Sequence, residues 1–177
     1  ADVYSTYNNL LKGRISKSAK KYSALEPSSS ALVFYWGVKI NSNNLEAHNI
    51  LFSGDYKKEF RELFHEKILP QDPTVYIYIS KKFSPGDAPA GEENWFVMIN
   101  APNSKSSSRQ DGTSTKRWND KAQMTNKYVE PFSKTETLSG NVDIAGAKSI
   151  IIEKIKRLTG YDIRDKIVCE NILTPRD

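Results

Sequence analysis

The sequence predicts an α+β fold in which a mixed or mostly antiparallel sheet of four to five strands carries helices on one face. Residues 74–80 and 94–100 are apolar and aromatic segments with the period of two that is typical of strands. The Pro/Gly loop between them is too short for a confident crossover helix, so we expect antiparallel neighbours. Amphipathic segments at 53–70 and 143–160 supply helices that cover the sheet.

The chain begins with a short predicted helix between an N-cap at Ser5 and a stop at Gly13. Residues 31–40 follow as a continuously apolar segment, which predicts a strand covered on both faces. Gly37 inside this strand indicates a bulge or the close approach of another backbone. A second, shorter strand is expected at residues 48–53.

The two amphipathic segments have recognisable ends. The first has Ser53 or Asp55 as its N-cap, and Lys58 and Glu62 can pair at its polar edge. Its apolar face is formed by Tyr56, Phe60, Leu63 and Phe64. The second has a stop at Gly160. Its apolar stripe contains Ile151, Ile155 and Leu158, and a last strand is expected from about Ile167.

Residues 103–146 differ in amino-acid composition from the rest of the chain. They are rich in Ser, Thr, Asn and Lys, with only scattered apolar residues. Such a segment buries too little surface to offset the entropy of ordering it. We therefore expect a long mobile insertion, with Trp118, Tyr128 and Phe132 as anchor points.

Composition and charge exclude several classes of function. With 38% hydrophobic residues, the 177-residue chain suits one globular domain with a substantial core. The net charge of +5 is spread over isolated basic pairs, so we expect no nucleic-acid partner. Cys169 is the single cysteine, which excludes an internal disulfide and favours a reducing compartment. Its apolar surroundings predict a small buried side chain. No apolar run is long enough to span a bilayer.

A search for catalytic motifs returns no self-contained enzyme. His48 and His65 are the only histidines, and neither is placed beside a nucleophile or within a metal-ligand spacing. The glycine-rich motifs that bind dinucleotides and nucleoside triphosphates are also missing.

Aromatic residues on the predicted strands are the remaining candidates for a site. If helices cover only one side of the sheet, aromatic side chains on the other side can line a cavity for an extended apolar ligand. Packing within the core explains the same residues equally well. The candidate lining residues are Tyr35, Trp36, Tyr76, Tyr78 and Trp95.

Several blocks of this chain occur in the order and approximate spacing of bacterial carotenoid desaturases of the phytoene desaturase type. The blocks are ADVYSTYNNLL, SSSALVFYWGVK, HNILFSGDYKKEF, DPTVYIYIS, SPGDAPAGEENWFVMINAP and ILTPRD. The chain thus resembles this family over residues 1–102 almost continuously and again over about 150–177. Residues 103–147 depart from the family pattern, in which a short turn leads quickly into the next helix.

The resemblance implies an FAD-dependent flavoenzyme of the amine-oxidase-like superfamily that desaturates an acyclic carotenoid. It implies a cytoplasmic protein that contacts a membrane peripherally. Residues 1–177 would be an interior, substrate-binding fragment, since both flavin-contacting regions of such enzymes are missing and the chain starts with Ala rather than Met. FAD is then expected to bind the parent protein rather than this fragment alone. No catalytic residue is carried over, because no motif in this segment marks one.

Two alternatives stay open at this point. One keeps the fold and changes the reaction to that of a related saturase, isomerase or amine-oxidase-like enzyme. The other is a free-standing module that binds lipids or proteins.

Overall fold

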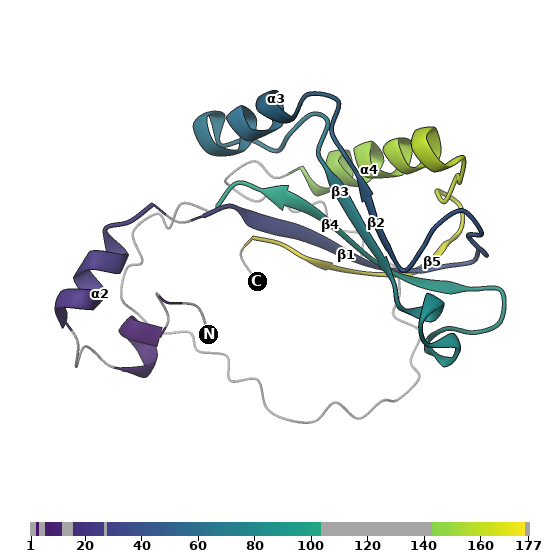
Figure 1. Ribbon diagram of the computed structural model, residues 1–177, viewed down its shortest axis with the longest axis horizontal. Helices are drawn as coiled ribbons and strands as arrows, with labels where there is room; N and C mark the ends of the chain where they lie inside the picture. Colours follow the sequence, from purple (N-terminus) through teal and green to yellow (C-terminus); the bar gives the residue numbers. More distant parts are fainter. Residues whose placement is uncertain (1–2, 4–5, 12–15, 27, 104–142, 176–177) are drawn as a thin grey trace.

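A computed structural model describes residues 3, 6–11, 16–26, 28–103 and 143–175. The centre of the fold is a five-stranded sheet with the order β2-β3-β4-β1-β5, in which every neighbouring pair is antiparallel. The strands are β1 (Ser30–Val38), β2 (His48–Leu51), β3 (Val75–Ile79), β4 (Glu93–Ala101) and β5 (Ile167–Leu173). Helix α4 (Ile144–Thr159) lies along one face (Figure 1). The α+β fold predicted from the sequence is confirmed.

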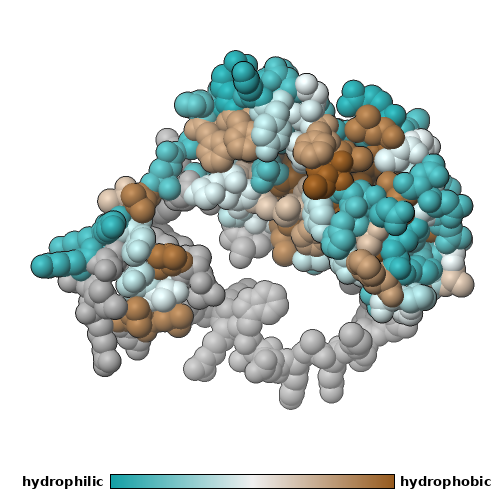
Figure 2. All heavy atoms as spheres, in the orientation of Figure 1, coloured by the Kyte–Doolittle hydropathy of each residue, from teal (hydrophilic) through white to brown (hydrophobic). Residues whose placement is uncertain are grey.

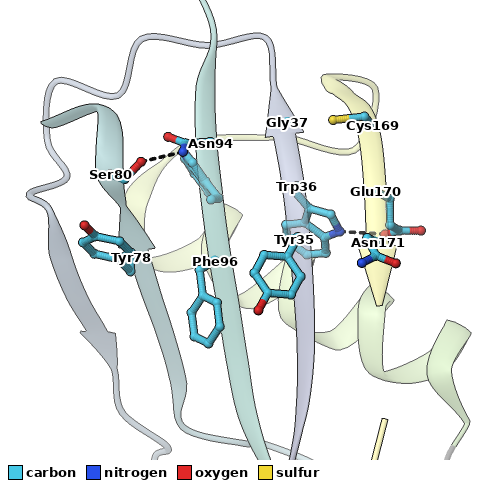
Figure 3. Close-up of a pocket in the computed structure, with 11 residues that line it drawn as sticks. Tyr35, Trp36, Gly37, Tyr78, Ser80, Asn94, Phe96, Cys169, Glu170 and Asn171 are labelled. Atoms are coloured by element: carbon cyan, nitrogen blue, oxygen red, sulfur yellow. Dashed lines mark hydrogen bonds between the residues drawn. The ribbon is translucent and has the colours of Figure 1, made fainter. Parts of the chain in front are cut away.

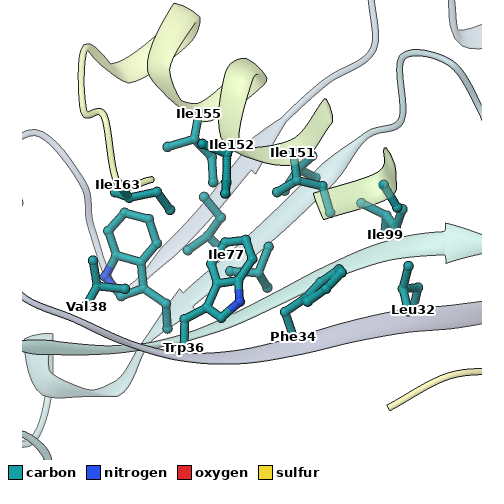
Figure 4. Packing of buried hydrophobic residues seen from close by; sticks show 14 of the residues in the cluster. Leu32, Phe34, Trp36, Val38, Ile77, Ile99, Ile151, Ile152, Ile155 and Ile163 are labelled. Carbon is teal, nitrogen blue, oxygen red and sulfur yellow. The ribbon is translucent and has the colours of Figure 1, made fainter. Parts of the chain in front are cut away.

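The sheet buries one face because its strands alternate. On β3 and β4, every second residue is buried and the residues between are partly exposed. The buried set faces α4, and Figure 4 shows the isoleucines of the helix directed onto it. Each fully buried isoleucine or valine of this kind contributes about 1.5–3 kcal/mol. The main strand members of the core are Leu32, Phe34, Trp36, Val38, Val75, Ile77, Ile79, Trp95, Val97 and Ile99.

Helix α4 ends at Gly160, as the sequence predicts, and begins after an N-cap at Asp143. The Asp143 side chain accepts a hydrogen bond from the backbone N–H of Gly146, and Gly160 ends the helix in the left-handed region at φ 80°. Ile151 and Ile155 are fully buried as expected. Leu158 was wrongly placed on the buried stripe, because it is 51% exposed and Ile152 takes the buried position.

Helix α3 (Tyr56–Arg61) continues directly into the π-helical turn η2 (Glu62–Glu66). Asp55 is the N-cap, since its side chain accepts a hydrogen bond of 2.9 Å from the backbone N–H of Lys58. The predicted pair of Lys58 and Glu62 forms at 3.7 Å. Leu63 is buried beside the carboxylates of Glu59 and Glu62, which are bonded to the chain just before β3.

The apolar face expected on this helix is only partly buried. Tyr56, Phe60 and Phe64 do share one side, with ring centroids 4.6 and 5.6 Å apart along the row. All three rings are exposed, however, and Tyr56 is 56% exposed. Glu59 and Leu63, next to this row on the helix, occupy the interior instead.

Buried polar groups tie the loops to the sheet. Glu93 accepts hydrogen bonds from the backbone N–H and the hydroxyl of Ser42 and from Nε1 of Trp95. Burial alone raises the pKa of Glu93, but the hydrogen bonds from Ser42 and Trp95, together with the charge of Lys82, lower the pKa below its ordinary value. The carboxylate therefore stabilises the fold in its ionised form.

The amino-terminal part of the chain differs from the sequence prediction. The helix expected at residues 5–13 is the shorter π-helical turn η1 (Thr6–Leu10), and helix α2 (Ser16–Ser23) was not predicted. Two short 3-10 turns, η3 (Ser80–Lys82) and η4 (Pro85–Asp87), lie between β3 and β4. Of the expected insertion at 103–146, residues 104–142 lie outside the described part of the chain, and residues 144–146 belong to α4.

Candidate functional site

The face of the sheet opposite α4 is the candidate site. Among the described residues, no helix packs on this open face, and Tyr35 at its centre is 42% exposed. A continuously apolar β1 had predicted a strand covered on both sides, and that prediction is wrong. Leu32, Phe34, Trp36 and Val38 lie on the covered face of β1, and the residues between them lie on the other face, as in a sheet with one solvated side.

Strand register arranges the side chains of the open face in three rows that run across the sheet. We call them the polar row, the aromatic row and the third row. The polar row contains Ser80, Asn94, Gly37 and Cys169. The aromatic row contains His48, Tyr78, Phe96, Tyr35 and Asn171. The third row contains Ile50, Tyr76, Met98, Val33 and Leu173.

A hollow of about 540 Å³ lies over the polar and aromatic rows (Figure 3). Gly37 lies between Asn94 on β4 and Cys169 on β5, and the thiol of Cys169 takes up the space that a side chain at Gly37 would need. A Cβ at Gly37 would lie only 2.5 Å from Sγ of Cys169. The register between β1 and β5 also shifts at this glycine. The bulge or close approach expected at Gly37 is therefore confirmed.

Aromatic rings form most of the floor of the hollow. Tyr35 meets Phe96 edge to face at a centroid distance of 5.4 Å, and Tyr76 approaches the same phenylalanine at 6.1 Å. His48 stacks on Tyr78 at 4.8 Å, and its Nδ1 lies 2.8 Å from the hydroxyl of Tyr76. Neighbouring rings in these geometries hold one another in place. The floor is therefore a largely aromatic surface whose side chains support one another.

Polar groups close one end of this floor. The side-chain amide of Asn94 donates to Oγ of Ser80 at 2.5 Å, and Ser80 in turn donates to Asp87 at 2.5 Å. The thiol of Cys169 is exposed, which contradicts the buried position expected from its apolar surroundings. Glu170 also borders the hollow, but its carboxylate accepts a hydrogen bond from Nε1 of Trp36 and pairs with Lys148 of α4.

The residues predicted from the sequence divide between the two faces. Tyr35, Tyr76 and Tyr78 lie on the open face, and Tyr35 and Tyr78 line the hollow. Trp36 and Trp95 border it from beneath, but each is 1% exposed and belongs to the core against α4 (Figure 4). Their indole rings cannot be presented to a ligand on the open face, because successive residues of a strand point to opposite sides.

Sequence reasoning missed Gly37, Ser80, Asn94, Phe96 and Asn171 as lining residues. A usable signal was present for Phe96. The alternation of β4 sets it opposite Trp95, on the side shared with the tyrosines of β3 once the strands pair in register. No signal in the sequence indicated Asn171, because its position depends on the pairing of β5 with β1.

The described residues contain no cluster of His, Cys, Asp and Glu that could hold a metal ion. None of the helices in this part of the chain is long and apolar enough to cross a membrane. The described strands are all antiparallel, so they do not form the parallel βαβ unit that binds the pyrophosphate of a dinucleotide. These residues therefore do not fit an FAD pyrophosphate.

Comparison with known proteins finds relatives that align with almost the whole chain. No protein-family profile matches it. A 1-hydroxycarotenoid 3,4-desaturase of Flavobacterium is 42% identical over 175 residues, which cover 99% of this chain and 29% of the relative. A 4,4'-diaponeurosporene oxygenase of Staphylococcus haemolyticus is 31% identical, with the same two shares covered. A phytoene desaturase of Neurospora crassa is 39% identical over 102 residues, or 56% of this chain and 17% of the relative.

Proposed function

Because this chain is homologous to a segment of carotenoid desaturases, about 29% of the length of the first two relatives, we propose that it is the substrate-binding part of such an enzyme. The whole protein would be an FAD-dependent desaturase, similar to phytoene dehydrogenases, that acts on an acyclic polyene. Residues 1–177 would form the floor of its substrate channel.

The observation that carries this proposal is the hollow over a fixed aromatic floor on a sheet face that α4 leaves open. A polyene is long, flat and apolar, and the rings of Tyr35, Tyr78 and Phe96 offer it a matching surface. Binding there would remove apolar area from water on both partners, at about 25 cal/mol per Å². The floor would also hold the reacting bond in one orientation and exclude water from it.

FAD belongs to this proposal as a group bound elsewhere in the protein. Carotenoid desaturases are FAD-dependent in general, and the described sheet lacks the βαβ unit that a dinucleotide requires. We therefore place the flavin on the portions of the protein that this chain does not span. The contribution of this chain is then limited to holding and orienting the substrate.

A second candidate is a carotenoid oxygenase. The diaponeurosporene oxygenase that is 31% identical over 178 residues favours it. The desaturase that is 42% identical over almost the same residues favours the first candidate more strongly.

A peripheral membrane contact would give the enzyme access to a substrate that dissolves in lipid. We place this contact at the row of exposed rings on α3 and η2, formed by Tyr56, Phe60 and Phe64. Figure 2 shows apolar side chains gathered over α3 and the nearby part of the sheet. Replacement of Phe60 and Phe64 by serine is expected to reduce cosedimentation with lipid vesicles, and unchanged cosedimentation would exclude this surface.

The test of the main proposal is turnover by the whole protein. We expect phytoene to be converted to products that absorb at longer wavelength, because each new double bond extends the conjugated system. A saturase would shift absorption to shorter wavelength, and an isomerase would leave the number of double bonds unchanged. Tyr35→Val should raise KM for the polyene about tenfold, whereas Tyr22→Val, at an exposed position of α2, serves as the matched control with no change. Absence of any change in a polyene would contradict the proposal.

A further inference from the structure

Exposed apolar side chains continue from the open face over the edge of the sheet. Strand β2 is an edge strand of four residues, and within the described part of the chain no further strand pairs with it. Ile50 of β2 belongs to the third row and is 54% exposed, and Phe52, two residues further on, is 65% exposed. We call Ile50 and Phe52 the edge patch.

Strand register and ring contacts join the edge patch to the hollow. Ile50 pairs directly with Tyr76 of β3, whose ring approaches Phe96 at a centroid distance of 6.1 Å. Phe96 in turn meets Tyr35 edge to face on the floor of the hollow. Neighbouring strands lie about 4.8 Å apart, and residues two apart on one strand lie about 7 Å apart. A polyene is longer than either step, so it can contact several of these side chains at once.

The other end of the edge patch leads to the proposed membrane contact. Phe52 lies in the short connection between β2 and α3, four residues before Tyr56. The rings of Tyr56, Phe60 and Phe64 then follow one another along α3 and η2. Figure 2 shows apolar side chains over α3 and over the nearby part of the sheet in one view. Exposed apolar side chains therefore extend from the proposed membrane contact to the open face.

We propose that the edge patch is the route by which an acyclic polyene passes from a lipid surface to the hollow. The inference rests on the proposed function and goes beyond it, because it names the path of entry and the residues that form it. A polyene that left the bilayer through water would expose its whole apolar surface, which the hydrophobic effect opposes. Along the edge patch, part of that surface stays covered at every step. Ile50 and Phe52 therefore speed the transfer and do not hold the bound ligand.

A residue on an entry route has a kinetic signature that a residue of the binding site lacks. Ile50 and Phe52 do not line the hollow, so they contact the polyene in transit and not in its bound position. Their replacement should slow association and dissociation by the same factor and leave the Kd unchanged. Replacement of Tyr35, which lines the hollow, should instead raise the Kd, mainly through faster dissociation.

The experiment follows transfer of a conjugated acyclic polyene from phosphatidylcholine vesicles to the whole protein, by stopped-flow quenching of tryptophan fluorescence. Replacement of both Ile50 and Phe52 by serine should slow the transfer about fivefold, because apolar contact with two side chains is lost during passage. Replacement by valine and leucine, respectively, keeps these positions apolar and should retain the wild-type rate. Both positions are more than half exposed, so we expect the serine variant to fold. Leu158→Ser, at an exposed position of α4, is the matched control and should transfer at the wild-type rate.

Two further measurements exclude other roles for the edge patch. Equilibrium quenching by the same polyene in detergent micelles should give the same Kd for the wild type and the serine variant. Cosedimentation with vesicles is expected to depend on Phe60 and Phe64, so the serine variant should cosediment as the wild type does.

The outcomes separate this inference from the proposed function. Unchanged transfer in the serine variant would overturn the route. A raised Kd would assign the edge patch to the binding site, and a loss of cosedimentation would assign it to the membrane contact. Either result would also overturn the route, although the proposed function stands. If the wild type binds the polyene neither from vesicles nor from micelles, the proposed function itself fails.

Discussion

Two consecutive residues of β1 provide a direct test of which sheet face is covered and which is open. Trp36 is 1% exposed, packs at 5.2 Å from the ring of Phe34 and donates a hydrogen bond to Glu170. Tyr35, its neighbour, is 42% exposed and makes an edge contact with Phe96. Substitutions at the two positions should therefore affect different properties of the protein.

The surroundings of the two residues determine how much each substitution should change the free energy of unfolding and the affinity for a polyene. Trp36→Ala removes a large buried ring and should lower the free energy of unfolding by about 3–5 kcal/mol. Tyr35→Val keeps a strand-forming residue and loses one aromatic pair, so it should cost about 1 kcal/mol. The same tyrosine change should weaken polyene binding about tenfold, because a ring of the floor is lost.

Urea unfolding followed by circular dichroism measures the first property, and quenching of fluorescence by a polyene measures the second. We expect a large loss of stability only for Trp36→Ala. A direct binding loss, in a protein of near-normal stability, should occur only at Tyr35. If Tyr35→Val destabilises the protein as strongly as Trp36→Ala, the face we describe as open is covered, and the reasoning about the hollow is refuted.

Three further predictions concern the fold that supports the hollow. Gly37→Ala should destabilise the protein, because the new Cβ would collide with Sγ of Cys169. In a double-mutant cycle, adding Cys169→Ala should recover part of the lost stability. Equal losses with and without the thiol would contradict the close approach. Ile151→Ala should cost about 2–5 kcal/mol by urea unfolding, whereas Leu158→Ala at an exposed position of the same helix should cost well under 1 kcal/mol. The lowered pKa of Glu93 means that its ionised form stabilises the fold above the ordinary carboxyl pKa of 4.5, and that this stability is lost as the pH falls through the lower pKa of the folded state. Acid unfolding of Glu93→Gln should accordingly show a weaker pH dependence below pH 4.5, and an unchanged dependence would assign the acid sensitivity to other groups.

Local patterns in the sequence predicted most of the fold. The alternation in β3 and β4, the N-cap at Asp55 and the left-handed stop at Gly160 are properties of short segments, and all are present. The prediction at Gly37 succeeded for the same reason, since a glycine inside a strand signals a local irregularity.

The candidate site was harder to predict because it depends on the pairing of distant strands. Trp36 and Trp95 were included for being aromatic, although the alternation of their strands already separates them from Tyr35 and Tyr78. Leu158 and the rings of α3 were assigned to buried faces from helical spacing alone, which cannot tell how much of a helix the sheet covers. The exposure of Cys169 follows from the position of β5 at the edge of the sheet, which no local pattern reveals.

The most direct test of the central claim is whether a bound polyene protects the thiol of Cys169 at the rim of the hollow. The rate of its alkylation can be measured by mass spectrometry of the peptide that contains it, with and without a saturating acyclic polyene. We expect alkylation to be slowed severalfold when the polyene is bound. An unchanged rate, with binding confirmed by fluorescence, would show that the ligand lies elsewhere in the protein.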